Sequence, residues 1–149
     1  MNEYRPSPRQ WVAEQVKLYE ESGGTAGLTL RDTGLPVIIV TNRGRRTGAI
    51  RKTPLMRVVD GDNYLLVASQ GGAPKHPQWY YNLKADPHVE IRDKTEVLPM
   101  RVREVVDPVE REQLWKIAVE AFPPYREYQK KTDRLIPIFL AEPVDEAHR

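Results

Sequence analysis

The chain has 149 residues, 40% hydrophobic and 30% charged, a composition typical of one soluble globular domain rather than a disordered or fibrous chain. It contains no cysteine, which excludes disulfides, thiolate catalysis and cysteine metal sites, and its longest apolar runs are too short to cross a bilayer. From these features we expect a cytoplasmic, single-domain protein over residues 1–149. The formal net charge is only +2, yet residues 33–85 hold eight Lys or Arg against two acids, which predicts a positive region suited to an anionic ligand.

A helix is expected within residues 1–24. Ser7, Pro8 and Gln10 form a pattern typical of a capped helix start, and apolar residues follow at roughly helical spacing until Gly23 and Gly24. Such a helix either docks on the body of the domain or lies on the inner face of a membrane. Docking is favoured, because glutamates along the helix offset the cations that an anionic bilayer attracts.

Strands dominate the middle of the chain, where the apolar period changes towards two. The continuous apolar run over residues 35–41 is typical of a strand buried on both faces. Residues 50–59 and 63–69 are expected to pair with each other around a turn at Asp60–Asn63, where Gly and Asn tolerate positive φ.

A short helix over residues 75–85 and two further strands are expected next. The helix stops before Pro87, and the strands cover residues 89–92 and 97–106. Pro99 inside the second strand predicts a bulge or an edge position, because proline has no N–H for a ladder.

The last third begins with a second capping box at residues 107–110, which opens an amphipathic helix. Residues 125–134 form a short helix or turn, residues 136–141 a last strand, and residues 144–149 a polar tail. The whole pattern predicts the α+β class: a small, mostly antiparallel barrel with helices packed around it.

Two connections concentrate positive charge. In residues 43–48 glycines allow a tight turn, and arginines supply planar forks suited to phosphate or carboxylate. Arg51 and Lys52 follow on a strand and should point to opposite faces, and we expect Arg51 to face the site. Neither a Walker loop nor a Rossmann fingerprint is present. The alternative is a solvated loop that happens to carry arginines.

The second connection, residues 68–77, ends a strand, turns at two glycines and begins a helix, where free N–H groups and Lys75 attract anions. Taken alone, the double glycine is simply a turn. His76 is interpreted as a loop residue rather than a general base, and three scattered histidines lack metal-ligand spacing, so no metal site is expected.

Aromatic residues offer either a wall for a flat ring or ordinary core packing. Tyr125 and Tyr128 are three residues apart on one helical face, and Trp79 is a third member of such a wall. Nucleic-acid binding is disfavoured, because the cations gather at two turns rather than along a stacking surface.

Three segments, residues 36–55, 67–83 and 125–137, resemble the deazaflavin-dependent nitroreductase family of split β-barrel oxidoreductases. The similarity extends from about residue 35 to residue 143. It implies a split β-barrel that binds coenzyme F-420, a deazaflavin with a phosphate and an oligoglutamate tail.

The resemblance also implies roles for particular residues. Arg45, Arg46 and Arg51 would bind the phosphate and acidic tail, and Tyr125 and Tyr128 would border the substrate, with Tyr128 as a candidate proton donor. The remaining cofactor-binding candidates, to which Lys75 is added for its charge, are Thr53, Pro54, Leu55, Met56, Ser69, Gly71, Gly72, Ala73, Trp79 and Asn82.

Two positions depart from the family pattern. Gln70 stands where the loop often has a lysine, and Phe122 stands where relatives that reduce nitroimidazoles have a further tyrosine. We therefore expect an F-420-dependent reductase of electron-poor alkenes or quinones, with nitro compounds as further substrates. The alternatives are a split barrel that uses FMN and a carrier that binds the deazaflavin without catalysis.

Overall fold

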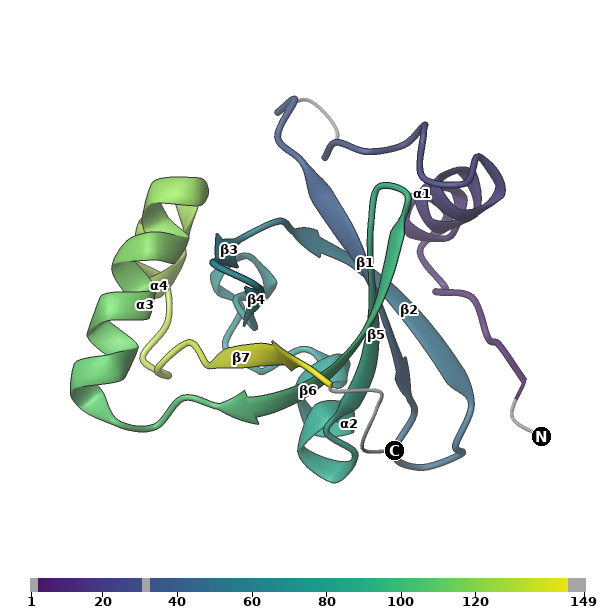
Figure 1. Ribbon diagram of the computed structural model, residues 1–149. Coiled ribbons are helices and arrows are strands. Elements are labelled where there is room, and N and C mark those ends of the chain that lie inside the picture. The colour runs from purple at the N-terminus through teal and green to yellow at the C-terminus, as the bar shows by residue number, and fades with distance from the viewer. Residues whose placement is uncertain (1–2, 31–32, 145–149) are drawn as a thin grey trace.

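The computed structural model describes residues 3–30 and 33–144, and apart from Val144 the expected polar tail lies outside the described residues. Figure 1 shows one strongly curled sheet with helices around it. The seven strands are ordered β2-β1-β5-β6-β7-β4-β3, and every neighbouring pair is antiparallel. Their bounds are β1 Val37–Arg43, β2 Ile50–Met56, β3 Val59–Asp60, β4 Asn63–Val67, β5 His88–Asp93, β6 Glu96–Glu104 and β7 Ile138–Pro143.

The sheet curls until β2, at one end of the strand order, lies against β4 near the other end. This curl confirms the expected α+β split barrel. β1 is buried on both faces, as its apolar run predicts, because Val37 and Ile39 pack into one hydrophobic cluster and Ile38 and Val40 into another. The first cluster is covered by α1 (Gln10–Glu21), α3 (Pro108–Ala121) and α4 (Pro124–Lys130), and the second by α2 (Gln78–Ala85).

The expected pairing of residues 50–59 with residues 63–69 is wrong. β2 pairs along its whole length with β1, from Arg43↔Ile50 to Val37↔Met56, and β4 pairs with β7. Only the short β3 joins β4 around the predicted turn. The reason is local: β2 follows β1 after the short connection at residues 44–49 and folds back on it as a hairpin, whereas β4 takes β7 as its partner.

No bulge interrupts the β5–β6 register at Pro99, and β6 is an inner strand between β5 and β7, but Pro99 itself lies beyond the β7 ladder. The carbonyl of Pro99 accepts a hydrogen bond from the N–H of Val144, beyond the last ladder pair at Pro143. In an antiparallel strand the N–H and C=O of one residue point to the same side. The missing N–H of Pro99 therefore faces a position where the β7 ladder has already ended.

Of the four α-helices in the described residues, α3 alone has a side-chain cap at its start. Asp107 accepts a hydrogen bond from the N–H of Glu110 and caps α3, as predicted. At α1 the N-cap is Arg9 rather than Ser7, and the Ser7 hydroxyl accepts from the Arg9 N–H. The apolar residues of α1 nevertheless pack on the barrel: Val12, Val16 and Tyr19 are buried. Docking of this helix on the body, the favoured alternative, is confirmed.

Candidate functional site

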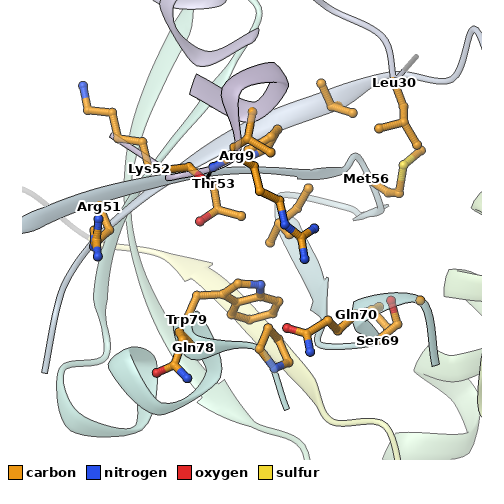
Figure 2. Close-up of a pocket in the computed structure, with 18 of the residues that line it drawn as sticks. Arg9, Leu30, Arg51, Lys52, Thr53, Met56, Ser69, Gln70, Gln78 and Trp79 are labelled. Atoms are coloured by element: carbon orange, nitrogen blue, oxygen red, sulfur yellow. Dashed lines mark hydrogen bonds between the residues drawn. The ribbon is translucent and has the colours of Figure 1, made fainter. Parts of the chain in front are cut away.

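A cavity of about 720 Å³ opens between the sheet and the N-terminal end of α1 (Figure 2). One side, here called the sheet wall, consists of β2 and of lining residues between 69 and 82. The opposite side, here called the N-terminal roof, consists of lining residues between Arg5 and Val12. The far end is apolar and is formed by Leu30, Val37, Val67, Phe122, Tyr125 and Tyr128. This volume is ordinary for a small-molecule or cofactor site.

The first part of the sheet wall is β2, which is the terminal strand of the sheet order. Its lining residues run from Arg51 to Met56 and include four of the expected cofactor contacts, Thr53, Pro54, Leu55 and Met56. Among the described residues, the outer edge of β2 is paired only through the Tyr4↔Ile50 bridge to a short N-terminal stretch. Beyond that bridge, backbone N–H and C=O groups of a terminal strand are available to a bound ring.

Arg51 and Lys52 take opposite directions from β2. The Arg51 guanidinium lines the cavity and donates to the carbonyl oxygens of Arg5 and Pro6 at 3.0 and 3.4 Å. The Lys52 ammonium reaches α1 and pairs with both carboxylate oxygens of Glu20 at 2.6 and 2.8 Å. Both cations therefore tie the sheet wall to the N-terminal part of the chain, but only the charge of Lys52 is neutralised by a carboxylate.

The arginine turn lies beside the cavity rather than in its wall. Arg45 and Arg46 are exposed and are not among the lining residues, and the Arg45 guanidinium lies 5.0 Å from the centre of the Tyr81 ring. The Arg45 N–H donates to the Asn82 side-chain oxygen at 3.0 Å. Because Asn82 lines the cavity, this bond attaches the turn to the cavity rim.

The loop at residues 69–76 is organised by one arginine. The Arg134 guanidinium donates to the carbonyls of Ala68, Ser69 and Ala73 and contacts Nδ1 of His76, all within 3.1 Å. The pKa of His76 is lowered, first by burial and then by Arg134, so Nδ1 stays neutral and accepts. His76 is thus a loop residue, as interpreted from the sequence, and Arg134 is the positioning residue that sequence reasoning did not single out.

Gly72 has a packing role in the same loop. Its φ is +83°, and a Cβ at this position would lie 2.6 Å from the carbonyl oxygen of Tyr128 in α4. Of the expected contacts from the loop, Ser69 and Gly71 line the cavity, whereas Gly72, Ala73 and Lys75 do not. The helix that follows brings Trp79 and Asn82 to the cavity.

The apolar end carries the two candidate tyrosines. Tyr125 is 4% exposed, and burial raises the pKa of its hydroxyl well above the ordinary value. Among the described residues no hydrogen bond involves the Tyr125 or Tyr128 hydroxyl. The rings of Phe122 and Tyr125 meet edge to face at 4.9 Å, and Tyr128 lies next to both. These rings form an apolar surface with two hydroxyls that have no hydrogen bond to the described residues.

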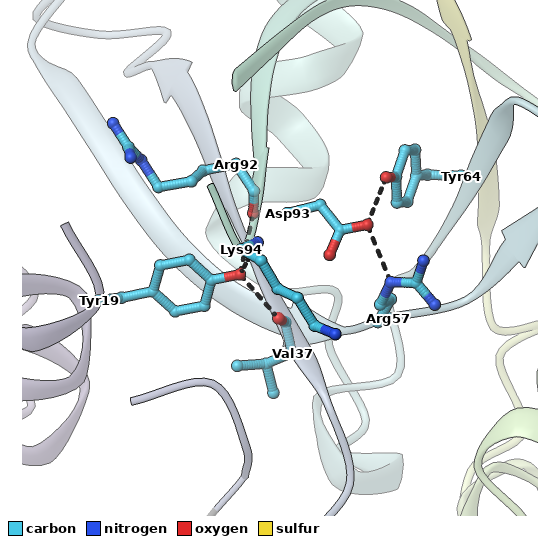
Figure 3. Close-up of polar contacts among 7 residues, drawn as sticks. All are labelled: Tyr19, Val37, Arg57, Tyr64, Arg92, Asp93 and Lys94. Carbon is cyan, nitrogen blue, oxygen red and sulfur yellow. Dashed lines mark hydrogen bonds and ion pairs between the residues drawn. The ribbon is translucent and has the colours of Figure 1, made fainter. Parts of the chain in front are cut away.

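The N-terminal roof was missed by sequence reasoning, which assigned no site residue before Arg45. Its lining residues are Arg5, Ser7, Pro8, Arg9, Trp11 and Val12. The roof is fastened at the far end of α1 by Tyr19, whose hydroxyl accepts from the Lys94 N–H at 2.6 Å and lies 3.3 Å from the Val37 carbonyl (Figure 3). The one sequence signal for the roof was the helical spacing of apolar residues in α1, which predicts that this helix packs on the body of the domain.

Other kinds of site find no support within residues 3–30 and 33–144. No group of three or more His, Asp or Glu side chains is placed to hold a metal ion there. None of the helices in those ranges is long and apolar enough to span a membrane.

Comparison with known proteins gives consistent matches. A family model described as F420H2-dependent quinone reductase matches residues 11–143. An F420H2-dependent quinone reductase of Mycobacterium tuberculosis is 40% identical over 111 residues, 70% of this chain and 72% of the relative.

Two solved structures share about half of their residues with this chain. A structure of F420-H2-dependent reductase, FDR-A, is 53% identical with a TM-score of 0.68, and the match covers 72% of this chain and 94% of that one. A second structure, described as a domain-swapped dimer, is 50% identical with a TM-score of 0.70 and covers 91% and 100%.

Proposed function

The chain belongs to the F420H2-dependent quinone reductase family and is an F-420-dependent reductase, and on that premise we propose that its cavity binds coenzyme F-420 and reduces quinones there. The observation that carries the proposal is the polarity of the cavity. Arg5, Arg9 and Arg51 line one part, aromatic rings line the other, and among the described residues no Asp or Glu lines it. A flat ring with a negatively charged tail requires this combination.

The residues present fit such a coenzyme in two groups, one for the ring and one for the phosphate and tail. The edge of β2 at Thr53–Met56 and the indole of Trp79 would hold the ring, with Ser69, Gly71 and Asn82 beside it. Arg51 would bind the phosphate, and the exposed Arg45 and Arg46 at the rim would meet the tail carboxylates. Gly72, Ala73 and Lys75 would act indirectly, by shaping the loop.

The reduced coenzyme supplies a hydride when bound, so the protein needs no strong general base. What the chain contributes is position, exclusion of water and hydrogen bonding. A quinone takes up a proton as well as a hydride, and Tyr128, with Tyr125 beside it, is our candidate donor. Both hydroxyls are free of hydrogen bonds within the described chain.

Other electron-poor substrates belong to the same proposal. Enones accept a hydride and a proton in the same way, and nitro compounds are the weaker candidates because Phe122 offers no hydroxyl. The family match gives no support to FMN as the cofactor, and a carrier without catalysis does not fit a family of reductases.

Titrating the purified protein separately with F-420 and with FMN would test the cofactor. We expect saturable quenching with F-420 and at least about 100-fold weaker binding of FMN, which lacks the acidic tail. Oxidation of the reduced coenzyme is then followed with a naphthoquinone, a cyclic enone and a nitroimidazole. Tight F-420 binding with no quinone-dependent oxidation would contradict the substrate proposal.

The Tyr128→Phe variant tests the proton donor. Turnover of the quinone should fall by about tenfold or more with unchanged F-420 affinity, because only the hydroxyl is removed. The matched control is Tyr81→Phe, an exposed tyrosine that does not line the cavity. Unchanged turnover in the Tyr128→Phe variant on all three substrates would exclude this hydroxyl.

A further inference from the structure

The charges around the cavity are not balanced. Four cations line it, Arg5, Arg9, Arg51 and Lys52, and no carboxylate of the described chain does. The charge of Lys52 is neutralised by Glu20, which lies outside the cavity lining with its Oε1 2.6 Å from the Lys52 Nζ. The three arginines have no ion-pair partner among the described residues, so the cavity holds uncompensated positive charge and favours an anion.

Two of these three arginines come from the N-terminal roof. Arg51 donates to the carbonyls of Arg5 and Pro6, which keeps the roof next to β2. Arg9 is the N-cap of α1, and Figure 2 shows its side chain extending from the start of that helix into the cavity, towards the wall that carries Trp79 and Gln70. The guanidinium of Arg9 has no hydrogen bond to any described residue, so all five of its N–H groups are available.

The position of Arg9 along the cavity decides what it can bind. Arg45 and Arg46 are exposed outside the lining, where flexible tail carboxylates can reach them. Arg9 is exposed as well, but it lines the cavity, and its side chain points towards Gln70 and Trp79. It is therefore placed to meet the part of a ligand that joins a ring in the cavity to an outer tail. In coenzyme F-420 that part is the phosphate.

We propose that Arg9 binds the coenzyme phosphate from the N-terminal roof, opposite Arg51 on the sheet wall. The inference rests on the proposed function, since it takes F-420 as the ligand. A guanidinium fork matches two phosphate oxygens, and two arginines on opposite sides enclose the anion without a lysine in the loop. The roof is then part of the binding site rather than only its cover.

The test compares the Arg9→Gln variant with a matched control, Lys17→Gln. Lys17 lies on the same helix, is exposed and lines a separate groove rather than the cavity. The measurement is the dissociation constant of F-420 from fluorescence titration at low and at moderate salt. We expect about tenfold weaker binding and a shallower salt dependence for Arg9→Gln, and a change of less than about twofold for Lys17→Gln.

A second probe separates the phosphate from the ring. A deazaflavin that carries only its ribityl chain lacks the phosphate, and the Arg9→Gln variant should bind it as the unchanged protein does. Equal weakening for this probe and for F-420 would overturn the proposal, because Arg9 would then act on the ring or on the fold. Unchanged F-420 affinity in Arg9→Gln would overturn it too.

These failures are distinct from failure of the proposed function, which would show as absence of F-420 binding by the unchanged protein. A rescue variant guards against a purely structural loss. Gln70→Lys, added to Arg9→Gln, places a cation into the same space from the opposite wall. Recovery of most of the lost affinity is expected, and no recovery would contradict a shared phosphate position.

Discussion

The two sides of the cavity are built in different ways. The sheet wall is continuous with the barrel: β2 is hydrogen-bonded to β1 over seven residue pairs, and the loop at residues 69–76 is fixed by the Arg134 guanidinium. Within the part of the chain that the structure describes, the N-terminal roof is joined to the sheet by one β-bridge, at Tyr4 and Ile50, and otherwise by side chains. The wall is therefore expected to be the more stable side, and the roof the side that opens first.

This difference separates two tasks. The wall can hold a ring in one orientation because its backbone cannot move without breaking the sheet. The roof can admit a large, tailed coenzyme because, among the described residues, few side chains fasten α1. They are the Tyr19 hydroxyl, the Lys52–Glu20 pair, the Gln15 amide on the Gly27 and Thr29 carbonyls, and the apolar stripe. Variants that affect one side alone show whether this division is real.

The largest expected effect comes from Arg134→Met. It removes the cation that binds three carbonyls and His76, and the loss of unfolding free energy should be about 3 kcal/mol, because those groups lose a charged donor. Denaturant unfolding measures it, and F-420 binding should weaken because the loop is no longer shaped. The exposed Arg126→Met on α4 is the control. If the Arg134→Met variant kept its stability and its F-420 affinity, the idea that Arg134 keeps the sheet wall rigid would be wrong.

Tyr19→Phe tests the roof and should cost about 1–2 kcal/mol, because the partly buried Lys94 N–H loses its acceptor (Figure 3). Hydrogen exchange should rise in α1 and at the β5–β6 turn while β1 stays protected. Tyr4→Phe is the control, since the Tyr4 hydroxyl has no hydrogen bond to the described residues. Equal loss of protection in α1 and β1 would show that the roof does not open separately.

The wall could largely be anticipated from the sequence, because its signals are local. An apolar run specifies a strand buried on both faces, Asp107 caps its own helix, and the motif residues 53–56 and 69–82 lie on elements adjacent to one cavity. Strand partners could not be anticipated in the same way. Both neighbours of β2 in the sequence offer it a hairpin, and the pattern does not say which of them pairs, while the partner of β4 is the distant strand β7.

The roof could not be anticipated, because a helix start says nothing about which surface the helix covers. The Ser7–Gln10 pattern predicts a cap but gives no cue that Arg9 enters a cavity. The charge density of the arginine turn was visible, whereas the direction of its side chains was not: Arg45 stacks on Tyr81. Side-chain direction depends on tertiary contacts that no short motif encodes.

A smaller effect is expected from the ion pair between wall and roof. A double-mutant cycle with Lys52→Met and Glu20→Gln should give a coupling of about 0.5–1 kcal/mol, since both side chains are about four-fifths buried. The control is the Lys116–Glu112 pair on α3, which is 3.8 Å apart and mostly exposed, and should give nearly zero. If the coupling energy of the Lys52–Glu20 pair were as small as that of the Lys116–Glu112 pair, the Lys52–Glu20 pair would not fasten the roof.

The smallest expected effect is a pH dependence inside the wall, at His76. Its folded pKa is lowered by burial and by Arg134, so between that lowered value and the unfolded value near 6.5 the unfolded chain binds more protons. Stability from neutral His76 is therefore complete above about pH 6.5 and is lost as the pH falls through this window. Unfolding of His76→Gln at pH 7.5 and 5.5 should show a weaker decline than the unchanged protein, with the exposed His88→Gln as control. Identical declines in all three proteins would mean that Nδ1 does not accept from Arg134, and the loop would then depend on the three carbonyl bonds alone.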